Sequence, residues 1–332
     1  MSGREHMAFS TDVLRIDVSG VAGAIQDAIR QQVRFLHRRG AVVGLSGGID
    51  SSVVTCLCAR ALGAPRVQVL LMPERDSSSD ALTLGRLLTT TLGVPALVED
   101  ITPVLEAAGC YRRQIEAIRA AFPEYGDGYR CKISLPSILD SNRLNVSELT
   151  IATPSGEVRK SRLSAEAYQQ MVAATNFKQR VRKMTEYYHA DRLNYAVAGT
   201  PNRLEYDQGF FVKLGDGAAD LKPIAHLYKT QVYALAEHLG VPPEILRRPP
   251  TTDTFSMPQT QEEFYFALPY QKMDLCLYGR NHEVPAAEVA GAVGLTAEQI
   301  ERVYRDIDQK RRTTRYLHER PLLVEPVPEV SH

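Results

Sequence analysis

The stretch that decides the fold reads Ala41-Val-Val-Gly-Leu-Ser-Gly-Gly-Ile-Asp-Ser-Ser52. Its apolar start, Ala41–Leu45, predicts a buried strand, and the residues from Ser52 to Leu62 predict a helix that Gly63 ends. The two adjacent glycines between them allow the backbone to come close to a ligand. A loop of this kind favours phosphate binding, because the N–H groups and the dipole of the following helix point at it.

The rest of the chain continues this alternation of short apolar runs and helical patterns. Further strands are predicted at Val67–Met72, Ala96–Ile101 and Asn194–Gly199. Helices are predicted at Val21–Leu36 and Asp80–Leu92, in one long stretch ending before Pro123, at Lys229–Leu239, Glu262–Tyr278, Ala286–Val293 and Ala297–Tyr316. Such alternation predicts an α/β fold with a doubly wound parallel sheet, followed by a C-terminal helical part at about 255–320.

One segment departs from this pattern. From about 125 to 163 the helical period disappears, and Pro154-Ser-Gly156 between apolar runs predicts a β-hairpin. A segment of about 40 residues makes a poor independent core. We therefore interpret it as an insertion within a single domain that spans residues 1–332.

Composition narrows the class of protein. Lys and Arg number 39, as do Asp and Glu, so the net charge is zero and no general nucleic-acid partner is expected. The longest apolar run, 67–72, is too short to span a membrane, and no basic-then-apolar leader opens the chain. The five cysteines contain no CxxC pair, which predicts neither a disulfide framework nor a four-cysteine zinc site. A cytoplasmic protein without a membrane partner is the expectation.

The loop itself carries chemistry. The hydroxyls of Ser46 and Ser51 add hydrogen-bond donors, whereas the carboxylate of Asp50 suits an anion site only with a cation such as Mg²⁺ between the two charges. An ordinary strand–turn–helix corner would be the alternative interpretation. No GxxxxGK[ST] sequence is present, which disfavours a kinase or a motor ATPase.

The string Ser46-Gly-Gly-Ile-Asp-Ser51 resembles the pyrophosphate loop of the N-type ATP pyrophosphatases, which cleave ATP to AMP and pyrophosphate. Three later stretches, 176–184, 198–205 and 209–224, resemble the NAD synthetase family, and the resemblance runs from about 33 to 277. It implies an adenine nucleotide alpha hydrolase-like, Rossmann-like fold. It also implies an ATP-dependent amide ligase that adenylates nicotinic acid adenine dinucleotide and amidates it with ammonia, giving NAD, AMP and pyrophosphate.

The resemblance assigns roles to matching residues. It implies ATP contacts at Gly44, Ser46, Gly47, Gly48, Asp50, Ser51, Thr200, Lys229 and Thr251. It implies contacts with the acceptor substrate, nicotinic acid adenine dinucleotide, at Asn176, Arg180, Lys213, Asp220 and Lys310. It also implies Mg²⁺ ligands at Asp50 and Glu205. Asp216 and Asp220 would bind and deprotonate ammonium, and Lys229 completes the implied catalytic set. Bringing a carboxylate to a triphosphate requires positive charge, which Arg180, Lys213 and Lys229 can supply.

Three departures from the family pattern suggest a divergent member. The insertion lies where the family chain is shorter, residues 262–270 are bulky and aromatic, and the family's His-Lys pair is Gln309-Lys310. The same chemistry on another carboxylic acid is therefore one alternative. Sulfur transfer through Cys110 or Cys131 is a second, and a non-catalytic nucleotide sensor is a third. The resemblance further implies a homodimer, and the chain has no room for a glutaminase domain, so ammonia would be free or come from a separate glutaminase.

Overall fold

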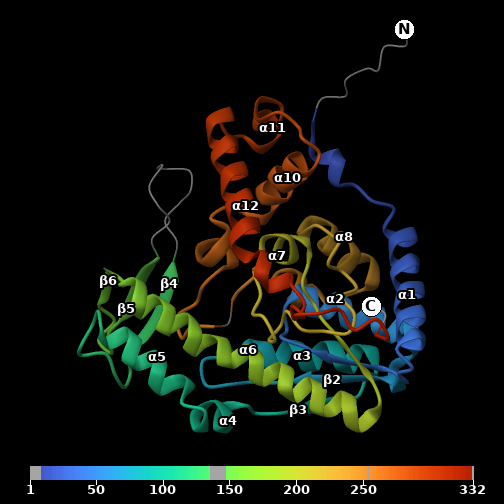
Figure 1. Cartoon of the computed structure of the whole chain (residues 1–332), viewed down its shortest axis with the longest axis horizontal. Helices are drawn as coiled ribbons and strands as arrows, with labels where there is room; N and C mark the ends of the chain where they lie inside the picture. The colour runs from blue at the N-terminus through green and yellow to red at the C-terminus, as the bar shows by residue number, and fades with distance from the viewer. Residues whose placement is uncertain (1–8, 135–146, 253, 331–332) are drawn as a thin grey trace.

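The structure, a computed structural model, describes residues 9–134, 147–252 and 254–330 (Figure 1). Its centre is a four-stranded sheet with the strand order β3-β2-β1-β7. All three pairings are parallel. The strands are β1 (Ala41–Gly44), β2 (Val67–Leu71), β3 (Ala96–Val98) and β7 (Ala196–Ala198). The predicted parallel α/β sheet is confirmed.

Helices cover both faces of this sheet. Because side chains alternate along a strand, Val43 and Val69 face one layer while Val42 and Leu70 face the other. The first layer contains α1 (Val18–Phe35), α2 (Ile49–Leu62), α3 (Ser79–Leu92) and α8 (Lys229–Leu239). The second contains α4 (Thr102–Ala107), α5 (Cys110–Arg119) and α6 (Ala165–Leu193).

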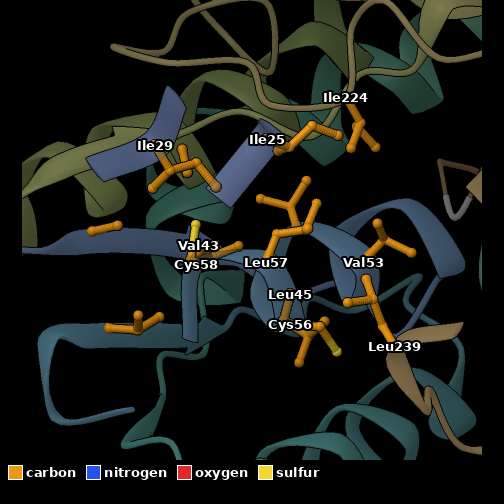
Figure 2. Packing of buried hydrophobic residues seen from close by; sticks show 14 of the residues in the cluster. Ile25, Ile29, Val43, Leu45, Val53, Cys56, Leu57, Cys58, Ile224 and Leu239 are labelled. Carbon is orange, nitrogen blue, oxygen red and sulfur yellow. The ribbon is translucent and has the colours of Figure 1, made fainter. Parts of the chain in front are cut away.

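The first layer forms the main hydrophobic core. Figure 2 shows Ile25 and Ile29 of α1 packing towards Val43 of β1 and Leu57 of α2. Cys56 and Cys58 lie in the same cluster, and all five cysteines are free and buried. Among the residues described, no helix has both the length and the apolar character that crossing a membrane requires.

A second, antiparallel sheet lies at one end of α6 (Figure 1). It consists of β4 (Arg130–Ser134), β5 (Glu148–Ala152) and β6 (Val158–Arg162). β5 and β6 are joined at 153–157, where the sequence predicts a hairpin, whereas β4 is not predicted. The sheet packs against α5 and the start of α6 through Ile118, Ile151 and Met171. Residues 135–146 of the predicted insertion lie outside the described residues.

The C-terminal helices form a separate layer above the main sheet (Figure 1). They are α10 (Tyr270–Asn281), α11 (Ala286–Val293) and α12 (Ala297–His318), and they pack on α7 (Arg203–Gln208) around an apolar cluster that includes Met273 and Val303. The remaining elements are η1 (Thr11–Leu14), η2 (Ala64–Arg66), α9 (Pro243–Leu246) and η3 (Glu262–Phe266).

Several predicted boundaries are wrong for local reasons. Helix α2 begins at Ile49, so Asp50 lies in its first turn rather than before the helix. The single helix predicted after Ile101 is two helices, because Gly109 adopts a left-handed φ of 73°. The helix predicted from Glu262 breaks at Ala267, where φ is 58°.

Candidate active site

A cavity of about 430 Å³ opens at the carboxyl ends of the parallel strands, where ligands bind in open α/β sheets. Gly44, Leu71 and Ala198 mark the strand ends at its lining. Its polar end is lined by Ser46, Gly48, Asp50, Ser51, Thr200, Glu205 and Lys229. Its aromatic end is lined by Phe210, Phe211, Phe255, Phe264 and Tyr265.

The loop before α2 is held in shape by its own hydroxyls. The amide of Ser46 donates to Ser51 Oγ at 3.2 Å, and the amide of Gly48 donates to Ser46 Oγ at 3.3 Å. Gly47 has a φ of 75°, which a glycine adopts without strain. Gly48 is the N-cap and supplies no side-chain bond, so the first N–H groups of α2 remain available to an anion.

Two carboxylates and one ammonium meet beside this loop. Lys229 Nζ donates to Asp50 Oδ2, and Asn202 Nδ2 donates to Asp50 Oδ1 at 3.2 Å. Glu205 Oε1 accepts from Gln261 Nε2 at 2.9 Å, and its Oε2 accepts from the amide of Asn202 at 3.0 Å. The site therefore places an anion-binding helix end next to a paired acidic and basic group.

The electrostatics of this group fit a divalent cation. Burial and the negative charge of Asp50 raise the pKa of Glu205 to about 7. Burial alone would lower the pKa of Lys229, but the carboxylates of Asp50 and Glu205 raise it above its ordinary value. Two nearby carboxylates beside a phosphate site are a donor set that suits Mg²⁺, which binds through one or two carboxylates plus substrate phosphates.

Asp274 of α10 fixes the start of the helix that carries Lys229. Its Oδ1 accepts from the amide of Lys229 at 3.1 Å, and its Oδ2 accepts from the amide and hydroxyl of Thr230 at 2.6 and 2.5 Å. Burial raises the pKa of Asp274 to about 6, and these hydrogen bonds act against the shift. Sequence reasoning missed this residue, because its hydrogen-bond partners lie about 45 residues earlier in the chain.

Replacing Asp274 with alanine should lower the free energy of unfolding by about 3 kcal/mol, because three buried donors lose their acceptor. Urea unfolding followed by circular dichroism measures the change. Asp308→Ala is the control, since Asp308 pairs with Arg280 at a partly exposed site and should cost at most about 1 kcal/mol. Equal losses in the two variants would contradict the assignment.

The structure brings three further predicted residues, Asn176, Asp216 and Thr251, to the cavity. Asn176 lines it from α6, and Asp216 lines it from the loop after α7. Asp216 Oδ1 accepts from the amide of Val212 at 2.7 Å, and burial raises the pKa of Asp216. Thr200 and Thr251 also line the cavity. Gly47 is not among the lining residues, although its neighbours Ser46 and Gly48 in the same loop are.

Arg180, Lys213, Asp220 and Lys310 are not brought to the cavity. Lys213 Nζ donates to the carbonyl groups of Tyr316 and Glu319, and Arg180 Nε donates to the carbonyl of Lys213 at 3.4 Å. Asp220 is exposed, and its Oδ2 accepts from the amide of Val197 at 2.7 Å. Lys310 Nζ bonds Asp306 and the carbonyl of Tyr265. Acceptor binding by these four residues stays a prediction.

Helical geometry explains which residues of α6 face the cavity. Asn176, Gln179, Lys183 and Glu186 line it, and their spacing of three and four residues places them on one side of the helix. Arg180 does not lie on that side of α6. Lys183 Nζ and Glu186 Oε2 form a buried pair at 2.6 Å. The basic run 178–183 is therefore only partly a solvated face, and sequence reasoning missed this pair.

Glu186 also explains one glycine of the loop. A Cβ at Gly44 would lie 2.6 Å from Glu186 Oε1, so α6 and the phosphate loop are in close contact. Asn202 was missed as well, although a signal existed: Asn202-Arg-Leu-Glu205 has the spacing of a capping box, which the structure shows.

Comparison with known proteins identifies the family. The family model described as NAD synthase matches residues 21–121 and 138–317. An NH3-dependent NAD(+) synthetase of Mesorhizobium japonicum is 63% identical over 312 residues, which are 94% of this chain and 98% of that protein. One of Rhizobium meliloti is 57% identical over 328 residues, 99% of this chain and 98% of that protein.

Solved structures support the fold alone. The NH3-dependent NAD synthetase of Campylobacter jejuni superposes with a TM-score of 0.62 at 22% identity, covering 93% of this chain and 100% of that chain. The NMN synthetase of Francisella tularensis superposes with a TM-score of 0.65 at 22% identity, covering 93% of this chain and 99% of that chain.

The comparisons correct one expectation, and the structure disfavours one alternative. The three departures do not mark a divergent member, since relatives 63% and 57% identical span nearly the whole chain. The sulfur-transfer alternative also loses its basis, because burial raises the pKa of Cys110 to about 11 and raises that of Cys131. A sulfur-carrying cysteine needs an accessible thiolate. The chain belongs to the NAD synthase family.

Proposed function

We propose that this chain is an ammonia-dependent NAD(+) synthetase. It would use ATP to adenylate the carboxylate of nicotinic acid adenine dinucleotide and ammonia to convert the adenylate to the amide. The observation that carries the proposal is the meeting of the phosphate loop with Asp50, Glu205 and Lys229 in one cavity. The relatives that span this chain, named as NH3-dependent NAD(+) synthetases, support it.

The residues of the cavity suit the first step. The N–H groups at the start of α2, with Ser46 and Ser51, would bind the phosphates that leave as pyrophosphate. An oxygen of the acceptor carboxylate attacks the α-phosphorus, and the bond to pyrophosphate breaks. Asp50 and Glu205 would hold Mg²⁺, which supplies positive charge against the triphosphate. Lys229 adds a cation that stays protonated, since its pKa is raised.

The second step needs a free amine. Ammonia attacks the carbonyl carbon of the adenylate, the bond from carbon to the AMP oxygen breaks, and AMP leaves. Asp216 is the residue of the predicted pair that lines the cavity, and its raised pKa suits a group that takes a proton from ammonium. Asp220 lies outside the cavity, and its assigned part in deprotonation stays a prediction.

A cavity of about 430 Å³ is of the order that holds one small ligand. ATP and a dinucleotide acceptor together exceed it, so the acceptor would extend beyond the cavity. We propose that its distant half binds along α6 near Arg180, Lys213 and Asp220, with a second copy of the chain completing the site. We also propose that residues 1–332 form one domain with an insertion at 125–163, and that ammonia is free or comes from a separate glutaminase.

The exposed face of α6 supports the homodimer. Met184 and Tyr188 follow Arg180 at intervals of four residues and are 57% and 64% exposed, and Leu214, the residue after Lys213, is 72% exposed. Clustered exposed apolar side chains mark interaction sites.

Replacing both Met184 and Tyr188 with Asp should convert a dimer into a monomer in size-exclusion chromatography with light scattering. Phe35→Asp on α1, exposed to 80%, should leave the mass unchanged; a dimer that survives both substitutions on α6 would exclude this face.

The activity test is direct. The protein is incubated with ATP, Mg²⁺, ammonium chloride and nicotinic acid adenine dinucleotide, and NAD, AMP and pyrophosphate are measured. We expect the three products in equal amounts. When nicotinic acid mononucleotide replaces the dinucleotide, we expect neither its amide, nicotinamide mononucleotide, nor AMP. AMP release with another carboxylic acid, and none with the dinucleotide, would favour the alternative acceptor. No AMP with any acid would exclude the ligase.

A further inference from the structure

Residues 254–265 form one side of the cavity, which we call the cavity wall. Thr254, Phe255, Gln261, Phe264 and Tyr265 line the cavity from this segment. Most of the segment lacks regular secondary structure, since only η3 at its end is helical. Its backbone pairs with residues 250–252 near one end, at 259–261, and the position of the remainder depends on what lies behind it.

Lys178 of α6 holds the first end of the cavity wall. Its side chain is 1% exposed, and its Nζ donates to Glu74 Oε1 at 3.0 Å, to Asp76 Oδ2 at 2.7 Å and to the carbonyl of Thr254 at 2.9 Å. These bonds use all the donors of the ammonium group. Glu74 is itself fixed, because Tyr111 donates to its Oε2 at 2.9 Å.

The same network reaches a second segment that lines the cavity. Glu74 and Asp76 belong to the loop that follows β2, and Ser77 and Ser78 of that loop line the cavity. Lys178 therefore ties two cavity-lining segments, which lie more than 150 residues apart in the sequence, to one point on α6. Replacing a buried charge cluster by apolar residues is often neutral or stabilising, so stability alone is a weak reason for such a cluster.

Strand β4 of the small sheet holds the middle of the cavity wall. The amide of Cys131 donates to Ser256 Oγ at 3.0 Å, and the amide of Met257 donates to the carbonyl of Cys131 at 3.0 Å. Gln259 Nε2 donates to the carbonyl of Ile133. β4 is the edge strand of its sheet, so these bonds use backbone groups that β5 leaves unpaired.

We propose that Lys178 and strand β4 position the cavity wall for ATP, and that Lys178, Ser256 and Gln259 are positioning residues of the active site. The small sheet of β4, β5 and β6 thus supports the cavity wall from behind. This inference rests on the proposed function in one respect, namely that the cavity binds ATP.

Three variants test the proposal: Lys178→Met, Ser256→Ala and Gln259→Leu. The dissociation constant for ATP is measured by calorimetry, and steady-state kinetics give kcat and KM for ATP. Lys178→Met should weaken ATP binding and lower kcat/KM roughly 10- to 100-fold, because small displacements of positioning groups are costly. The other two should each weaken binding about five-fold, the value of one hydrogen bond. Hydrogen exchange should speed up in 254–265 and stay unchanged in β1 and β2.

Lys160→Met is the matched control. Lys160 lies on β6 of the same sheet and pairs with Glu148 at a site that is largely exposed, so ATP binding and exchange should match the wild type. Should Lys178→Met fail to fold, Ser256→Ala and Gln259→Leu decide the question alone. Wild-type ATP affinity and wild-type exchange in these variants would overturn the inference. A wild-type protein that binds ATP but forms no NAD would overturn the proposed function and leave this inference standing.

Discussion

Replacing Lys229 with methionine should lower kcat about a thousand-fold, the loss seen when one charge-stabilising group is removed from a transition state. The side chain of Lys229 is 2% exposed, and its ammonium group lies against Asp50. Without it, less positive charge offsets the repulsion among Asp50, Glu205 and the phosphates. Initial rates at saturating ATP and acceptor measure the effect.

Two further variants make this result specific. Lys229→Arg keeps the charge, but the wider guanidinium does not fit a site shaped for an ammonium group, so kcat should lie between wild type and Lys229→Met. Lys160→Met makes the same chemical change at a largely exposed position and should leave kcat unchanged. Circular dichroism confirms that each variant is folded. A folded Lys229→Met protein with most of its kcat would remove Lys229 from the chemistry.

Replacing Gly47 with alanine should weaken ATP binding roughly 100-fold, which corresponds to about 3 kcal/mol. Gly47 has a φ of 75°, and a Cβ there would lie 2.6 Å from the carbonyl oxygen of Ala81 and 3.0 Å from its Cα. Both atoms belong to the backbone of α3, so they cannot move aside without moving a helix. The loop must shift instead, and its N–H groups then leave the phosphates. Calorimetric titration with ATP measures the loss.

Gly63 provides the comparison. It also has a positive φ, 87°, but an added Cβ would meet nothing within 4 Å. Gly63→Ala should therefore cost about 1–3 kcal/mol of stability, because its φ of 87° and ψ of 140° lie near a region that is essentially restricted to glycine, and should leave ATP affinity unchanged. An unchanged ATP affinity in Gly47→Ala would show that the loop does not hold the nucleotide.

The central sheet and the phosphate loop could be predicted from sequence because both are local. Each strand is a short apolar run, and the loop follows β1 directly. Asp50, Glu205 and Lys229 lie together as the resemblance implies. Asn202 could have been added from its spacing to Glu205 alone, since a capping box is a local pattern.

The remaining features depend on contacts between distant parts of the chain. Lys178 resembles the exposed Arg180 of the same basic run, and only the approach of Glu74, Asp76 and Thr254 makes it a buried ion. The position of β4 depends on pairing with β5 across residues outside the described part of the chain. Lys310 was assigned by its place in a motif, yet it bonds Asp306 one turn earlier in α12.

An isotope-transfer experiment tests the central claim, which is that the acceptor carboxylate attacks the α-phosphorus of ATP. Nicotinic acid adenine dinucleotide is prepared with a heavy-oxygen label in its carboxylate and incubated with the protein, ATP, Mg²⁺ and ammonium, and the products are analysed by mass spectrometry. Formation and amidation of an adenylate predict that label appears in AMP and that pyrophosphate carries none. Label in pyrophosphate or orthophosphate, with AMP unlabelled, would contradict the account.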